Sequence, residues 1–168
     1  MSETGAHTAE AVDPDVDLSV PRQRWELRRA PWSTLGAISA GGVLGALARY
    51  GISTAFPHPP DAFAWATWGI NVSGCLLIGI LMVAITELWQ AHRLVRPFLG
   101  VGVLGGFTTF STAIVEAQQA VQAGAAPTGL IYLAATLAGA LVAVYAGVHL
   151  TRLLARPLRR HREGRGRS

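Results

Sequence analysis

Long apolar stretches alternate with short polar ones along this chain, and four apolar stretches are long enough to cross a bilayer. They cover about residues 33–55, 63–88, 97–119 and 128–151. Since a bilayer core about 30 Å thick needs roughly 20 apolar residues per helix, each stretch predicts one membrane-spanning helix. The polar stretches between them are too short for a soluble domain; they lie at 57–61, 90–96 and 122–127. We therefore expect an all-α membrane protein with four transmembrane helices.

The two ends of the chain differ from this transmembrane domain, which we place at 33–154. Residues 1–32 are polar, contain proline and show no apolar periodicity, which is typical of a disordered arm. Residues 155–168 form a basic tail. Arg28 and Arg29 precede an apolar run, as in a twin-arginine export signal. Because that run continues and three more spans follow, we expect the first helix to be retained.

Composition supports this interpretation. Hydrophobic residues make up 51% of the 168 residues, charged residues 14%, and the mean hydropathy is +0.35. These values are too apolar for an ordinary soluble domain. Cys75 is the one cysteine and lies within the second span, so it cannot form an intrachain disulfide.

The basic residues, all arginines, indicate an orientation. Four precede the first span, two lie in the second turn and seven follow the fourth span, whereas the first and third turns have none. The positive-inside rule predicts that both termini and the second turn are cytoplasmic, with the chain in the cell inner membrane. The pI is about 10.2, but the arginines flank spans and form no patch with interleaved aromatics, so we expect no nucleic-acid partner.

Several polar side chains inside the spans each need a protein, water or substrate partner. Arg49, late in the first span, can reach the far interface or line a vestibule for anions. Asn71 can join two helices or line a pore, and Glu116 has the same need for a partner. Tyr132 and Thr136 share a helix face and can extend a polar track, unless Thr136 bonds its own backbone.

Small-residue motifs predict close packing between helices in the membrane. They are Gly41-x-x-x-Gly45, Gly69-x-x-x-Ser73 and Gly102-x-x-x-Gly106. Glu87 ends the second span beside Trp89, where we expect interfacial water to solvate its carboxylate.

The stretch GGFTTFSTA, residues 105–113, combines two glycines with hydroxyl side chains that compete for backbone hydrogen bonds. It therefore predicts a break in the third helix. A break at membrane depth is tolerated where the freed backbone groups meet protein, water or an ion. Freed carbonyls suit a hard cation, while the amides of the restarted helix and the hydroxyls of Ser111 and Thr112 suit an anion. The positive edge of the Phe110 ring can also contact an anion.

Three motifs on successive helices resemble those of the CrcB (Fluc) fluoride channels. They are GGVLGALARY at 41–50, GINVSG at 69–74 and GGFTTFST at 105–112. The resemblance covers roughly residues 36–150 and implies passive, fluoride-specific export from the cytoplasm, which relieves fluoride toxicity. It also implies an antiparallel dimer of four-helix channel subunits, with two pores and a central structural sodium ion that is not transported.

The resemblance also implies roles for individual residues. The backbone carbonyls of Gly105 and Thr108 would bind the sodium ion, with an equivalent pair from the second subunit. Asn71 and the Phe110 ring edge would contact fluoride. A polar track would continue through further pore candidates: Ser111, Thr112, Tyr132, Thr136 and Glu116. Arg49 is a pore candidate only from its place in the first span.

Two features depart from the family pattern. Ala113 stands where a second pore phenylalanine commonly follows, and the arginine bias favours one orientation, whereas a dual-topology homodimer needs balance. Both features suit one half of a pair of oppositely oriented homologues, or a non-conducting partner subunit. A small multidrug exporter is the rival interpretation. It would need a membrane-embedded acid for proton coupling, but the first helix carries Arg49 instead. An enzyme is not expected, because His92 and His149 stand apart from any nucleophile or metal-ligand cluster.

Overall fold

The computed structural model describes residues 31–88 and 91–165, with side chains described from 32 to 155 within those ranges. The described chain is helical throughout, apart from its connections. Residues from Thr34 onward form one compact unit. The predicted arm at 1–32 lies outside the described residues, except for its last two, which begin the first helix.

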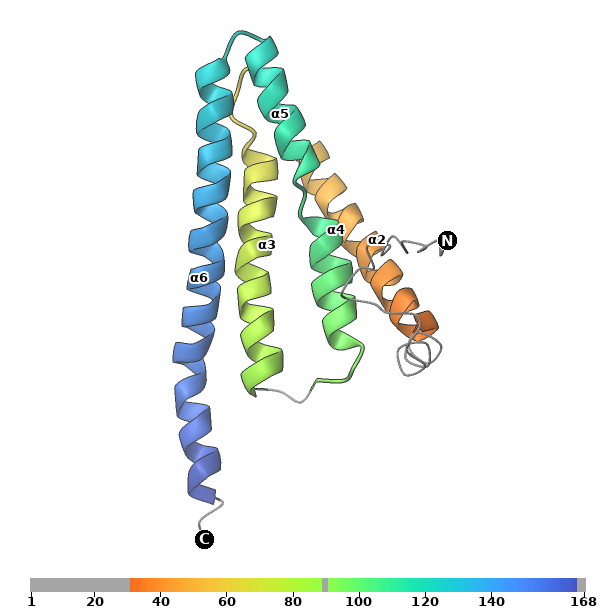
Figure 1. Cartoon of the computed structure of the whole chain (residues 1–168), viewed down its shortest axis with the longest axis vertical. Helices are drawn as coiled ribbons and strands as arrows, with labels where there is room; N and C mark the ends of the chain where they lie inside the picture. Colours follow the sequence, from red (N-terminus) through yellow and green to blue (C-terminus); the bar gives the residue numbers. More distant parts are fainter. Residues whose placement is uncertain (1–30, 89–90, 166–168) are drawn as a thin grey trace, which may run out of the picture. The chain divides into compact units, whose positions relative to one another are not determined.

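The helices follow the predicted spans closely (Figure 1). They are α2 (Pro31–Ala55), α3 (Trp65–Val83) with a π-helical extension η1 (Ala84–Leu88), the π-helical η2 (Arg96–Leu104), α4 (Gly105–Phe107), α5 (Ser111–Gln122) and α6 (Ala126–Arg165). Four stretches are long and apolar enough to cross a membrane: Trp32–Ala55, Trp65–Leu88, Arg96–Gln122 and Ala126–Ala155. The prediction of four membrane-spanning helices is confirmed by length and composition. Helix α6 continues without interruption into the predicted basic tail.

Glycines set two close helix contacts. A Cβ atom on Gly41 or Gly45 of α2 would collide with backbone atoms of Phe98 or Val103, and one on Gly102 or Gly106 would collide with the α2 backbone. The first and third small-residue motifs therefore pack against each other, as in membrane helix pairs generally. The second motif differs, because a Cβ atom on Gly69 would meet open space.

Helices α3 and α6 run side by side (Figure 1) and meet through a second glycine pair. A Cβ atom on Gly79 would meet the Val144 carbonyl oxygen at 2.6 Å, and one on Gly147 would meet the backbone of Leu76 and Ile80. The sequence motifs did not include this pair. The contact places Tyr132, on α6, next to the start of α3, where its ring packs edge-on against Phe63.

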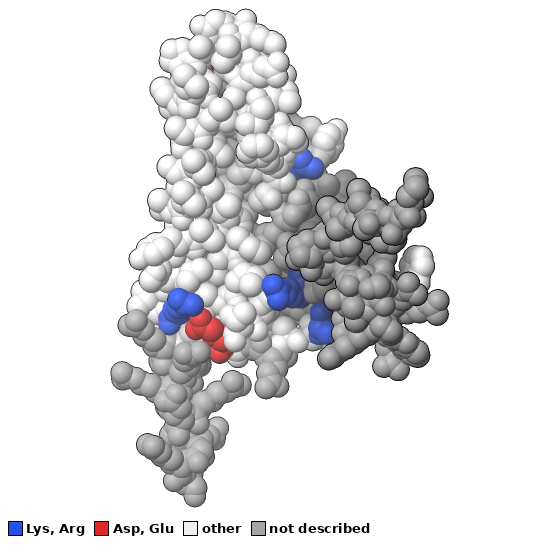
Figure 2. Space-filling model, viewed as in Figure 1, with Lys and Arg blue, Asp and Glu red and all other residues white. Residues whose placement is uncertain are grey.

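Large apolar side chains are exposed on α2 and α6, which suits contact with lipid or another helix. They include Val43, Leu47, Leu137, Leu141 and Val142. Charged side chains are sparse on the described part of the face that Figure 2 shows. Glu87 is not left to interfacial water alone, because the Arg152 guanidinium lies 2.8 Å from its carboxylate.

Candidate ion pathway at the interruption of the third span

The third span is interrupted between α4 and α5. Helix α4 ends at Phe107, Thr108 is extended with φ −75° and ψ 156°, and α5 begins at Ser111. Gly105 and Gly106 weaken the helix just before this point. Gly106 is also required by packing, because a Cβ atom there would meet the Gly42 backbone of α2, whereas one on Gly105 would meet open space.

Asn71 of α3 holds the interruption through both of its amide atoms. Its Nδ2 donates to the Thr109 carbonyl at 2.8 Å, and its Oδ1 accepts from the Thr109 N–H at 2.8 Å. Only 8% of Asn71 is exposed. Since an unpaired backbone group in a membrane interior costs several kcal/mol, these two bonds offset the free-energy cost of the non-helical geometry. Asn71 thus joins two helices, one of the two roles predicted for it.

Thr109 also supports the start of α5. Its hydroxyl accepts a hydrogen bond from the Thr112 N–H at 3.2 Å and donates to the Thr112 hydroxyl at 2.9 Å. A side-chain oxygen in this place satisfies one of the unpaired amides at a helix start. Thr112 therefore faces the interruption, while Ser111 is exposed.

Several backbone carbonyls around the interruption lose their usual helical donors. In a continuous helix the N–H of Thr109 would bond the Gly105 carbonyl, and the N–H of Thr112 would bond the Thr108 carbonyl. Here the first donates to Asn71 and the second to the Thr109 hydroxyl. The carbonyls of Gly105 and Thr108 are therefore among those that have no helical donor here. In the described part of the chain, no three His, Cys, Asp or Glu side chains gather as a metal site.

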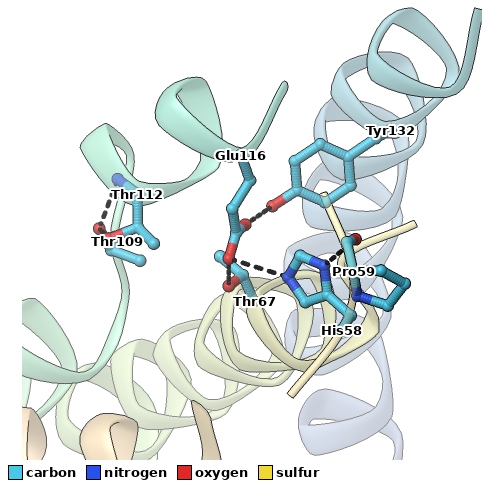
Figure 3. A network of polar contacts seen from close by, with 7 residues as sticks. All are labelled: His58, Pro59, Thr67, Thr109, Thr112, Glu116 and Tyr132. Atoms are coloured by element: carbon cyan, nitrogen blue, oxygen red, sulfur yellow. Dashed lines mark hydrogen bonds and ion pairs between the residues drawn. The ribbon is translucent and has the colours of Figure 1, made fainter. Parts of the chain in front are cut away.

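Further along α5, Glu116 is the centre of a second polar cluster (Figure 3). Its carboxylate accepts from the Thr67 hydroxyl at 2.6 Å and from the Tyr132 hydroxyl at 2.8 Å. The His58 Nε2 atom lies 3.5 Å from the same carboxylate. Glu116 follows Thr112 by one helical turn, so the two share a face of α5. Polar groups therefore continue from the interruption to the connection between α2 and α3, where His58 lies.

The remaining candidates lie in three different environments. Phe110 is 81% exposed and Ser111 is exposed beside it, so both are accessible at the interruption. Arg49 is half-buried on α2, the helix that packs against η2 and α4. Thr136 donates its hydroxyl to the Tyr132 carbonyl of its own helix at 2.7 Å. The Thr136 hydroxyl therefore bonds the backbone of its own helix α6, which was the predicted alternative to a place on the polar track.

Ala113, where the family resemblance led us to expect a phenylalanine, faces inward. It is 3% exposed and belongs to a buried cluster with Ala64, Ala117 and Tyr132. Phe63 and Trp68 pack against the same cluster. This alanine is therefore enclosed within its own subunit, and a larger side chain there would have to displace residues of the cluster.

Two members of the Glu116 cluster, Thr67 and His58, were not expected from the sequence. Thr67 had a detectable signal, because it precedes Asn71 by four residues and so lies on the same face of α3. His58 had none, since its position in a proline-rich turn does not specify which helix its ring will contact.

Comparison with known proteins identifies the family of this chain. The sequence profile of the family described as "CrcB-like protein, Camphor Resistance (CrcB)" matches residues 36–148. The chain is 54% identical over 116 residues to fluoride-specific ion channel FluC 2 of Nocardia farcinica, covering 69% of this chain and 83% of that relative. It is 51% identical over 121 residues to fluoride-specific ion channel FluC 1 of Streptomyces coelicolor, covering 70% and 79%.

A third relative, fluoride-specific ion channel FluC 2 of Thermobifida fusca, is 51% identical over 123 residues, which cover 73% of this chain and 91% of the relative. The family match contains the interruption, the Asn71 contact and the Glu116 cluster. With four apolar helices of membrane-spanning length, the chain is a multi-pass membrane protein. It belongs to the CrcB-like family, as its three sequence motifs indicated.

Proposed function

We propose that this protein is a fluoride-specific channel that exports fluoride passively from the cytoplasm and so relieves fluoride toxicity. The observation that carries the proposal is the interruption at 108–110, held open by Asn71 inside a membrane-spanning helix. The relatives' names specify the ion. A channel is not an enzyme, and the proposal requires no reaction.

The residues around the interruption can replace the hydrating water that fluoride loses, because they present hydrogen-bond donors and partial positive charges. The start of α5 carries the positive end of the helix dipole, and the hydroxyls of Ser111 and Thr112 can donate to a small anion. The exposed Phe110 ring can present its positive edge. The Asn71 amide borders the same site. From there the path would continue along α5 toward Tyr132 and Glu116.

We also propose that the freed carbonyls of Gly105 and Thr108 hold a structural sodium ion together with the same pair from a second, antiparallel subunit. Carbonyl oxygens are suitable ligands for a hard cation, and these two have lost their usual N–H donors. A bound sodium ion would supply positive charge at the centre of the assembly. The exposed apolar side chains of α2 and α6 would face lipid or that second subunit.

Gly105→Ala tests the cation site without disturbing packing within the subunit. A methyl group there meets open space in the subunit, and alanine favours the helix by about 1 kcal/mol, so we expect the subunit to fold while sodium binding and dimer stability decrease. Sodium dependence of the dimer fraction in detergent measures this effect. Gly106→Ala is the contrasting variant, because it should disrupt folding by colliding with α2. An unchanged sodium dependence in Gly105→Ala would contradict the site.

Fluoride efflux from liposomes tests the proposed function directly. We expect the purified assembly to release fluoride down its gradient, since neither a proton-coupling nor an ATP-binding signature occurs in the sequence. Chloride-loaded liposomes and protein-free liposomes are the controls. Efflux that required a proton gradient or ATP would point to a pump or an exporter.

A second candidate is a partner subunit that conducts poorly or not at all by itself. Ala113 supports it, because this residue is enclosed by its own subunit and offers no ring to a pore. The arginine bias supports it independently, since it favours insertion with both termini in the cytoplasm of the inner membrane. The second subunit would then be an oppositely oriented homologue instead of an identical chain.

Topology reporters distinguish the two assemblies. We expect a reporter fused to the C-terminus to be cytoplasmic only, because seven arginines follow the fourth span. Fluoride efflux should then be higher when the chain is co-expressed with an oppositely oriented homologue. Equal reporter signals on both sides, together with full efflux from the chain alone, would identify a homodimer.

A further inference from the structure

The first turn carries a histidine that contacts the candidate ion path, and the proposed function assigns it no role. His58 lies between α2 and α3, and its Nε2 atom is 3.5 Å from the Glu116 Oε1 atom (Figure 3). The two side chains are only 23% and 14% exposed. Glu116 also holds Thr67 and Tyr132, so this contact joins the turn to α3, α5 and α6.

The other ring nitrogen determines what this contact requires. His58 Nδ1 lies 3.0 Å from the Pro59 carbonyl oxygen, which can only accept, so Nδ1 must carry a hydrogen. In a neutral ring Nε2 would then hold a lone pair, facing a carboxylate oxygen. The arrangement is favourable when one further proton lies between Nε2 and Oε1. Both ring nitrogens are then donors, or the carboxyl group donates to Nε2.

The charge of the cluster follows from this proton. With it, His58 and Glu116 together are neutral, whichever atom holds it. Without it, their sum is −1. Among the described residues, the other titratable group facing Glu116 is the Tyr132 hydroxyl from α6, which donates to the carboxylate and is neutral. Helix α3 contributes Thr67, which does not titrate, and Asp61 is exposed in the same turn as His58. Histidine is the side chain that ordinarily changes charge between about pH 5 and 8.

We propose that His58 is a positioning residue for Glu116, and that the proton shared by the two sets the charge at the first-turn end of the fluoride path. When the pair is protonated, Glu116 is held and neutralised, and an anion can approach. When the proton is lost, an uncompensated carboxylate repels fluoride at the same place. This inference rests on the proposed function for its effect on flux, but not for the contact itself.

The pH dependence of fluoride efflux tests the proposal, with equal pH on both sides of the liposome. We expect wild-type efflux to be lower, by about threefold or more, at the alkaline end of the range measured than at the acid end, because loss of the shared proton leaves the cluster negative. His58→Gln should be independent of pH and slow, like the wild type at high pH. His58→Arg should be independent of pH and fast, because its cation persists. Protein-free liposomes correct for permeation of hydrogen fluoride through lipid.

His92→Gln is the matched control, because His92 is an exposed histidine in the second turn. Its efflux should keep the wild-type pH dependence. A pH dependence that survives in both His58 variants would overturn the proposal. Loss of pH dependence in His92→Gln would do so as well, since it would show that the effect is not specific to the Glu116 contact.

Hydrogen exchange at the first turn separates failure of this inference from failure of the fluoride channel. After correction for intrinsic exchange, protection of the His58, Asp61 and Ala62 amides should decrease with rising pH in the wild type and not in His58→Arg, since the other residues of the turn are prolines and have no N–H. If the wild type transports no fluoride, the proposed function is wrong, and the exchange result alone decides whether His58 holds the turn to Glu116. Equal protection of these amides at low and at high pH in the wild type would overturn that contact.

Discussion

Asn71→Leu is expected to reduce fluoride efflux by more than about tenfold, because it removes both bonds that hold the interruption of the third span. Leucine has a similar volume but leaves the Thr109 N–H and carbonyl unpaired, at a cost of about 1–3 kcal/mol each. The segment can recover those bonds by becoming helical, which would close off the Gly105 and Thr108 carbonyls. Efflux from liposomes and thermal unfolding in detergent measure the two consequences.

Ser73→Ala is the control for this experiment. Ser73 is also a polar residue of α3, but its hydroxyl bonds only the Ile70 carbonyl of its own helix. We expect its stability and efflux to stay near those of the wild type. If Asn71→Leu conducts fluoride as well as Ser73→Ala does, then the interruption does not depend on Asn71, and the amide has no place in the pore.

Gly45→Ala is expected to destabilise the subunit by about 1–3 kcal/mol, as overpacking of a tight contact does. Its Cβ atom would overlap the Val103 carbonyl oxygen and lie 2.8 Å from the Phe107 nitrogen. Both are backbone atoms, so no side chain can move aside to relieve the collision. Since these atoms belong to η2 and α4, a separation of the helices would also move the interruption. Thermal unfolding and fluoride efflux should both decrease.

Gly51→Ala provides the opposite result on the same helix. A methyl group at Gly51 meets open space, so only the helix propensity changes, in favour of alanine by about 1 kcal/mol. The difference between the two variants therefore isolates the contact with η2 and α4. Equal unfolding temperatures would mean that α2 does not pack closely against the third span.

The sequence alone identified the features that depend on local composition. Four spans followed from the length and apolarity of each stretch, and their bounds agree with the helices to within a few residues. The motifs at 41–50, 69–74 and 105–112 identified the family, which the comparisons confirm. The glycine motifs of α2 and η2 predicted close packing correctly, because small residues allow it wherever two such faces meet.

Only the tertiary structure decided which polar groups meet. Asn71 and Thr109 are 38 residues apart and Thr67 and Glu116 are 49 apart, so their contacts depend on how the helices are rotated against one another. Glycine contacts between backbones fix that rotation. The rotation places Ala113 in a buried cluster and leaves Phe110 exposed. Apolarity and helix propensity are properties of single stretches of chain. The pairing of His58 with Glu116 is a property of four elements packed together, and the sequence contains no local signal for it.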